Sequence, residues 1–170
     1  NRTFITFEAG ATHNGLRSSK KLVDIASSSG ADAIKFQLFN KDDLLSDKNQ
    51  IINFKYFNKK NEILSKRDKL YKIFERRQLS ESDWIKLKKY ADKKKILFFL
   101  TVGGLKELKI AKKLKCPSIK IASGDISFYP LIREVAKLKT NIQLDTGNST
   151  TKEIIKVIKL IEKYGNKNII

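Results

Sequence analysis

Three short apolar segments of this chain end in side chains that could bind an anion or move a proton. The segment Lys120–Asp125 (KIASGD) sets an ammonium group, a hydroxyl and a carboxylate close together, Glu8 closes an earlier apolar run, and Lys35 and Gln37 lie in another. Lysine supplies a point charge and hydroxyl groups donate hydrogen bonds, which is what phosphate and carboxylate groups require. The spacing therefore predicts an anion site built from the ends of several strands.

Short apolar runs alternate with longer amphipathic stretches, a rhythm typical of βα units around a parallel sheet. We expect strands over residues 3–8, 33–37, 96–101, 118–121 and 142–145, a sixth opening at Asn168, and helices over residues 18–29, 81–94, 105–114, 129–138 and 151–164. Parallel α/β barrels carry their catalytic groups at the carboxyl ends of the strands. A closed (βα)8 TIM barrel typically needs about 250 residues, so about five and a half units predict one partial TIM-barrel domain over residues 1–170, part of a longer polypeptide.

Residues 38–79 interrupt this rhythm, and a connection that long is usually functional. Within it, the apolar spacing over residues 70–74 predicts a short helix that caps one end of the barrel, with its Lys and Arg side chains in water.

The chain has 36 Lys and Arg against 18 Asp and Glu, a formal charge of +18, which favours association with polyanions. The lysines recur along most segments without a recognition-helix pattern, so we interpret them as solvated faces and expect no specific nucleic-acid partner. Such a field would still attract an anionic substrate. Cys116 is the only cysteine, and the longest strongly apolar run, Ile96–Leu100, is far too short to span a bilayer. A cytoplasmic protein without a membrane partner is expected.

Four motifs, taken in order, resemble those of the sialic acid synthase family. They are Phe7–Gly10 with His13–Gly15, Ala33–Gln37, Lys120–Asp125 and Asp145–Gly147, and the resemblance runs from about Phe4 to Ile170. Members of that family condense phosphoenolpyruvate with an amino-sugar aldehyde to form nine-carbon 2-keto acids and release phosphate. The resemblance implies an N-acetylmannosamine-like acceptor and a divalent metal, Mn²⁺ or Mg²⁺, held by histidines beyond Ile170. A homodimer is an open possibility.

The resemblance also assigns roles to single residues. It implies that phosphoenolpyruvate is bound by Lys35, Thr101, Lys120, Ser123 and Asp145. Glu8 and Asp125 face the sugar as catalytic acids or bases, His13 and Gln37 shape loops, and no metal ligand is expected within this chain. Structural alternatives stay open: Lys35 could pair with Asp32 or Asp125, Glu8 could form a buried salt bridge to a lysine, and Ser123 or Asp125 could serve a turn.

Three departures from the family pattern suggest a divergent subgroup. Thr12 replaces an asparagine, Val102-Gly103 replaces a proline-aromatic pair, and Asp145 replaces a serine. A carboxylate beside a phosphate is repelled by it, so Asp145 should pair with Lys120 or Lys35 or help hold a cation. The rival functions are another barrel lyase or aldolase acting on a phosphorylated sugar, and a degenerate barrel that has lost catalysis.

Overall fold

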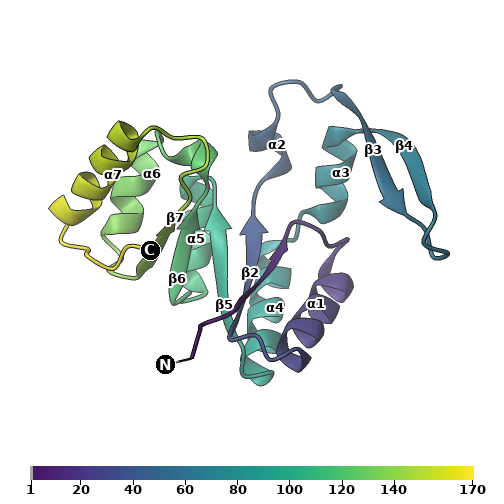
Figure 1. Ribbon diagram of the computed structural model, residues 1–170, viewed down its shortest axis with the longest axis horizontal. Helices are drawn as coiled ribbons and strands as arrows, with labels where there is room; N and C mark the ends of the chain where they lie inside the picture. The colour runs from purple at the N-terminus through teal and green to yellow at the C-terminus, as the bar shows by residue number, and fades with distance from the viewer. Residues whose placement is uncertain (1) are drawn as a thin grey trace.

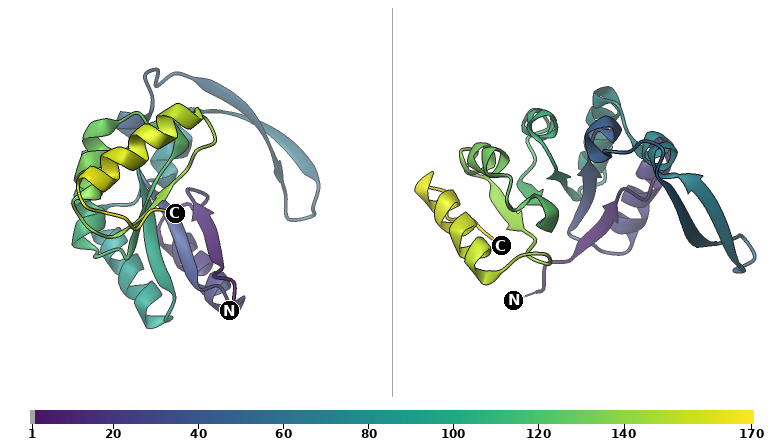
Figure 2. Two further views of the ribbon diagram at one scale, coloured as in Figure 1. Left: turned by 60° about the vertical axis from the view of Figure 1, so that its left-hand side comes forward. Right: turned by 90° about the horizontal axis from the view of Figure 1, so that it is seen from above.

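The computed structural model describes residues 2–170 and places five parallel strands in one sheet, in the order β1-β2-β5-β6-β7 (Figure 1). The strands are β1 (Thr6–Gly10), β2 (Ala33–Leu38), β5 (Leu97–Val102), β6 (Ser118–Ile121) and β7 (Asn141–Leu144). The helices that follow them are α1 (Leu16–Ser28), α4 (Glu81–Lys93), α5 (Leu105–Lys113), α6 (Tyr129–Ala136) and α7 (Thr151–Lys163). Seen from above in Figure 2, the strands form an arc with these helices outside it. The expected partial barrel is confirmed.

The bounds of the expected helices and strands agree with the structure to within two residues, except at the start of the first strand. β1 begins three residues later than expected because the Asp32 carboxylate, rather than a strand partner, accepts the backbone N–H of Ile5 at 2.8 Å. At the opposite edge, Ile169 forms a parallel bridge with Ile142, so a sixth strand begins where it was expected.

The two faces of the sheet differ in character because side chains alternate along each strand. Large apolar side chains of the helix-facing side, such as Phe36, Phe98 and Ile119, are fully buried. The inner face carries a hollow of about 260 Å³ lined in part by Leu97, Phe99 and Ile170. Leu97 is half exposed there, as expected for an arc whose inner core is completed by further strands.

The segment between β2 and α4 differs from its prediction. It contains α2 (Lys41–Leu44), β3 (Ile51–Phe57), β4 (Ile63–Lys69) and α3 (Leu70–Arg77). The expected helix exists as α3, but the antiparallel hairpin β3–β4 was not foreseen, and it projects from the body in Figures 1 and 2. The hairpin closes because the side chain of Asn58 accepts the N–H groups of Lys60 and Glu62 at 2.8 and 3.0 Å, and Asn61 adopts a left-handed φ of 60°.

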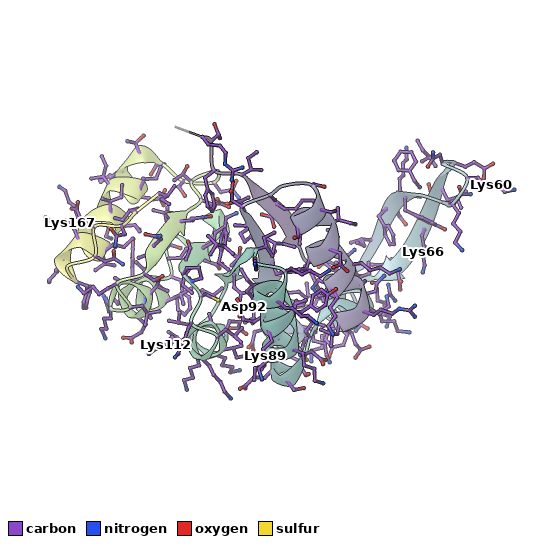
Figure 3. The ribbon with its side chains drawn as sticks, turned by 90° about the horizontal axis from the view of Figure 1, so that it is seen from below. Lys60, Lys66, Lys89, Asp92, Lys112 and Lys167 are labelled. Atoms are coloured by element: carbon purple, nitrogen blue, oxygen red, sulfur yellow. The ribbon has the colours of Figure 1, made fainter. Side chains whose placement is uncertain are left out.

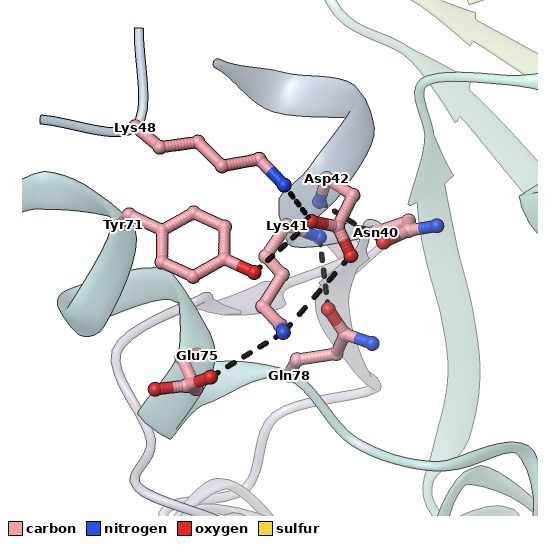
Figure 4. A network of polar contacts seen from close by, with 7 residues as sticks. All are labelled: Asn40, Lys41, Asp42, Lys48, Tyr71, Glu75 and Gln78. Carbon is pink, nitrogen blue, oxygen red and sulfur yellow. Dashed lines mark hydrogen bonds and ion pairs between the residues drawn. The ribbon is translucent and has the colours of Figure 1, made fainter.

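A polar network joins α2 to α3 and holds the loop that follows β2 (Figure 4). Asp42 accepts hydrogen bonds from the Lys48 ammonium at 2.6 Å and the Tyr71 hydroxyl at 3.0 Å, and the Lys41 backbone N–H donates to Gln78 at 2.8 Å. The hydrogen bonds from Lys48 and Tyr71 lower the pKa of the Asp42 carboxyl below its usual value. The network fixes the chain beside the carboxyl end of β2.

Lysines are spread over separate elements rather than gathered on one. Figure 3 shows Lys60 and Lys66 on the hairpin, Lys89 on α4, Lys112 on α5 and Lys167 after α7. This distribution agrees with the solvated-face interpretation. Over residues 2–170, each helix is too short or too polar to cross a membrane.

Candidate active site

Five of the expected site residues come from neighbouring strands and share the inner face of the sheet. Glu8 of β1 is in register with Lys35 of β2, while Gln37 of β2 is in register with Thr101 of β5, which in turn faces Lys120 of β6. Residues in register on parallel strands point to the same side. The strand ends therefore present a row of polar side chains.

Lys35 lies at the centre of this site. It is only 5% exposed, and its Nζ atom lies 2.6 Å from Oε2 of Glu8 and donates to Oγ1 of Thr101 at 2.9 Å. A buried ammonium group needs such partners, since burial without them is costly. Burial lowers the pKa of Lys35, the Glu8 carboxylate opposes that shift, and the charge of Lys120 adds to it. Of the alternatives, the ion pair with Glu8 is the one that forms.

Lys120 and Asp145 form a second ion pair beside the first. Nζ of Lys120 lies 2.6 Å from Oδ2 of Asp145, across the ends of β6 and β7. The carboxylate that departs from the family pattern is therefore paired with a lysine, as one of the expected arrangements requires. The site presents two ammonium groups, each held by one carboxylate.

Ser123 and Asp125 lie on the short 3₁₀ turn η1 (Ser123–Asp125) that follows β6. A methyl group at Gly147 would lie 3.9 Å from the Ser123 hydroxyl, and one at Gly103 would lie 3.7 Å from Oδ2 of Asp125. Both side chains thus face neighbouring loops at the carboxyl end of the sheet. Burial raises the pKa of the Asp125 carboxyl, which favours its protonated form relative to an exposed aspartate.

A cavity of about 580 Å³ opens beside these residues, where β2 and β5 end. Its lining includes three of the expected residues, Gln37, Thr101 and Asp125. It also includes Asp43 and Glu107, which sequence reasoning missed. The sequence did offer one indication for Glu107: it lies in the first turn of α5, and that helix begins directly after Gly103-Gly104. Asp43 lies in the long connection, where no pattern pointed to the site.

His13 lies apart from this group. It is 1% exposed, and its ring packs edge-on against Phe36 and Trp84, with centroids 5.9 and 6.3 Å away. Burial, helped by the charge of Arg77, lowers its pKa to about 4. Both partners belong to the core between sheet and helices, so the His13 ring lies on that side of the sheet. Its loop-shaping role stays a prediction.

Residues 2–170 gather no group of three histidine, cysteine or acidic side chains able to hold a metal ion. The described side chains thus do not fit the divalent cation that the resemblance implies. Its ligands beyond Ile170 stay a prediction.

The chain is thus a parallel arc of βα units, part of an α/β barrel, with two paired lysines at its strand ends. The chain belongs to the NeuB family, which it matches over residues 22–170. It is 38% identical to an uncharacterised protein of Methanocaldococcus jannaschii, covering 99% of this chain and 44% of that protein. It is 31% identical to N,N'-diacetyllegionaminic acid synthase of Campylobacter jejuni, covering 98% of this chain and 48% of the relative.

A solved structure of a related enzyme also supports the family assignment. The N-acetylneuraminic acid synthetase of Leptospira borgpetersenii superposes with a TM-score of 0.81 at 26% identity, covering 99% of this chain and 53% of that one. The chain spans about half the length of the relatives that it matches. The resemblance to the sialic acid synthase family is confirmed, and the fold is that of its barrel.

Proposed function

We propose that the full-length polypeptide containing this chain is a phosphoenolpyruvate-dependent synthase. It would join phosphoenolpyruvate to an N-acetylmannosamine-like aldehyde, giving a nine-carbon 2-keto acid and phosphate. The observation that carries the proposal is the buried Lys35, held by Glu8 and Thr101 beside Lys120 at the carboxyl ends of adjacent strands. Family membership and the names of the relatives support it.

Phosphoenolpyruvate carries its negative charge at a phosphate and a carboxylate, and the site offers donors for both. The ammonium groups of Lys35 and Lys120 lie on neighbouring strands, with the hydroxyls of Thr101 and Ser123 at the same edge. Charge-assisted hydrogen bonds are the strong ones, and preorganised donors stabilise charge that persists through the reaction. In this proposal, Glu8 and Asp145 hold the lysines until substrate oxygens replace them.

Two acidic groups, Asp125 and the Glu8 carboxylate once it is released from Lys35, would transfer protons. The enol carbon of phosphoenolpyruvate forms a bond to the aldehyde carbon, and the aldehyde oxygen takes a proton. In this proposal Asp125 donates that proton, and burial, which raises the pKa of its carboxyl, supports this role. Water then adds to the cationic carbon that bears the phosphate, and Glu8 accepts the proton that this water loses. Cleavage of the carbon–oxygen bond then releases phosphate, which takes the proton of the added hydroxyl, and leaves the 2-keto acid.

Dependence on Mn²⁺ or Mg²⁺, a cytoplasmic location and a homodimer remain predictions for the longer protein.

A second candidate, an aldolase that forms a Schiff base, is favoured by one observation. Burial lowers the pKa of Lys35, which would help a lysine act as a nucleophile. The contact of 2.6 Å with Glu8 opposes this, because the carboxylate stabilises the charged ammonium.

One experiment separates the two candidates. The full-length protein is incubated with phosphoenolpyruvate and N-acetylmannosamine, with and without Mn²⁺, and phosphate release and the sugar acid are measured. Equal amounts of phosphate and nine-carbon acid are expected. A second sample is incubated with pyruvate and treated with borohydride, and mass spectrometry is used to search for an adduct on Lys35. An adduct without phosphoenolpyruvate consumption would replace the synthase by the aldolase.

A further inference from the structure

The two faces of the hairpin β3–β4 differ in exposure. Residues of the two strands pair directly opposite each other and side chains alternate along each strand, so every second pair points to the same face. One face, which includes Ile52 and Phe54, is partly buried, and its Asp68 lies 2.9 Å from Arg76 of α3. On the other face, which we call the outer face, every residue is exposed. The outer face consists of the cross-strand pairs that involve Ile51, Asn53, Lys55 and Phe57 of β3.

The outer face and the adjoining turn carry positive charge that nearby carboxylates do not neutralise. The two acidic side chains of the hairpin are engaged elsewhere, since Asp68 pairs with Lys66 at 3.6 Å on the opposite face and Glu62 accepts a hydrogen bond from Asn58 at 2.7 Å. A cluster of Lys and Arg residues on one amphipathic element is typical of proteins that bind anionic lipid headgroups. Five cations of the hairpin form no ion pair within residues 2–170: Lys55, Lys59, Lys60, Arg67 and Lys69.

Apolar side chains accompany these cations. Phe57 and Ile63 form the last pair of the outer face, next to the turn, and are 70% and 62% exposed, while Ile51 at the other end is 47% exposed. A two-stranded hairpin gains no core from side chains that point into water, and contiguous exposed apolar surface marks a contact site. Apolar groups beside lysines suit the boundary between lipid headgroups and acyl chains, because the ammonium groups can stay at the phosphates.

Three other occupants fit this face less well. A second copy of this chain would bring the same excess of positive charge, +18, and be repelled by it. Protein interfaces are depleted in lysine, whereas four of the five unpaired cations are lysines. A nucleic acid would be attracted by the cations, but single strands also require aromatic side chains on which bases stack, and Phe57 is the one aromatic residue of the outer face.

We propose that the outer face of the hairpin binds the surface of an anionic lipid bilayer. The five cations would lie at the lipid phosphates, and Phe57 and Ile63 would enter the headgroup boundary beside them. Figures 1 and 2 show the hairpin projecting from the body, so it can reach a flat surface before the sheet and its helices do. Such a contact is peripheral and needs no spanning helix, and it differs from the expectation of no membrane partner, which was based on spanning segments. It is independent of the synthase function, because no substrate takes part in it.

Co-sedimentation of the full-length protein with vesicles, in the absence of substrate, tests this contact. We expect binding to phosphatidylcholine vesicles that contain phosphatidylglycerol, far weaker binding to phosphatidylcholine alone, and a loss of binding at high salt, because salt screens exposed charges. A lysine near an anionic surface changes the partition coefficient by a factor of roughly five, so Lys59→Gln with Lys60→Gln should lower it by about 25-fold. Phe57→Ser with Ile63→Ser should lower it by roughly tenfold or more.

Each double variant has a matched control. Lys89→Gln with Lys112→Gln removes the same charge from exposed positions on α4 and α5. Tyr56→Ser with Leu64→Ser removes the neighbouring apolar pair, which is 42% and 40% exposed on the opposite face of the same hairpin. Both controls should bind anionic vesicles within about twofold of the wild type, because neither changes the outer face or its turn.

A fluorescent reporter places the contact directly. In Phe57→Trp, emission should shift to shorter wavelengths when anionic vesicles are added, and the wild-type spectrum is subtracted to remove the contribution of Trp84. An absence of binding to anionic vesicles, equal binding to neutral ones, an unshifted spectrum, or equal losses in the variants and their controls would overturn the proposal. Single-stranded DNA binding that requires Lys59 and Lys60, without vesicle binding, would assign the face to nucleic acid instead. The comparison of the two kinds of vesicle is decisive even if a variant does not fold.

Discussion

Replacing Lys35 by methionine in the full-length protein should weaken phosphoenolpyruvate binding by roughly 10- to 100-fold. The Lys35 ammonium lies 2.6 Å from Glu8 and 2.9 Å from Thr101, so it is already positioned when substrate arrives. A hydrogen bond to a charged group contributes about 1.5–3 kcal/mol, and each 1.4 kcal/mol corresponds to a factor of about ten. That range gives the expected loss of affinity.

The fold should survive this substitution. Methionine keeps an unbranched side chain, one atom shorter than that of lysine, and removes the cost of burying a charge. The Glu8 side chain, 56% exposed, can be solvated once its partner is lost. The Thr101 hydroxyl loses one donor, at a cost of about 1 kcal/mol.

Titration calorimetry with phosphoenolpyruvate, together with thermal unfolding, tests the reasoning. Lys86→Met is the control, since Lys86 lies on the exposed side of α4 with its side chain 60% exposed. Unchanged affinity in a folded Lys35→Met protein would show that Lys35 is purely structural, and the anion site would have to lie elsewhere.

Three further outcomes are expected in the full-length protein. Asp145→Ser should free Lys120 from its ion pair and tighten phosphoenolpyruvate binding several-fold, measured by calorimetry; weaker binding would mean that Asp145 holds a cation or contacts substrate. Wild-type stability relative to His13→Phe should fall by up to about 3 kcal/mol as pH drops from 6.5 to 4, because protonation favours the unfolded chain, and parallel pH profiles from denaturant unfolding would contradict the buried neutral ring. Thr150→Ala should cost about 1 kcal/mol by breaking the capping box with Glu153, whereas unchanged denaturant midpoints would show that the cap is not coupled to global unfolding.

Regular βα units could be predicted from the sequence because each carries its own periodicity. The bounds of β6, Ser118–Ile121, match the expected strand, and at the start of α4 the side chain of Ser80 accepts the N–H of Asp83 at 3.2 Å. An element can be predicted from its own residues where an apolar run and a cap residue both indicate the same helix or strand. Parallel strand order then brings Lys35 and Lys120 to one edge.

Features that depend on contacts between distant segments could not be predicted in this way. The hairpin β3–β4 did carry a signal, since a run rich in β-branched and aromatic residues precedes Asn58, but its charged partner strand lacks alternation. Glu107 is assigned to the cavity only when α5 and the loop after β2 are placed together. Its neighbours in sequence are ordinary helix residues.

The pairing of β2, β5 and β6 fixes the spacing of Gln37, Thr101 and Lys120, whereas the neighbouring loop is free to change. Adjacent strands lie about 4.8 Å apart, so three side chains in register span about 10 Å, and a slip of one residue would turn them to the opposite face. The spacing of these three side chains is therefore fixed by the pairing of the strands. Gly103 and Gly104 lie outside that constraint, in the loop between β5 and α5. Mutation can therefore remodel this loop, which lines the cavity, while the three side chains in register keep their spacing.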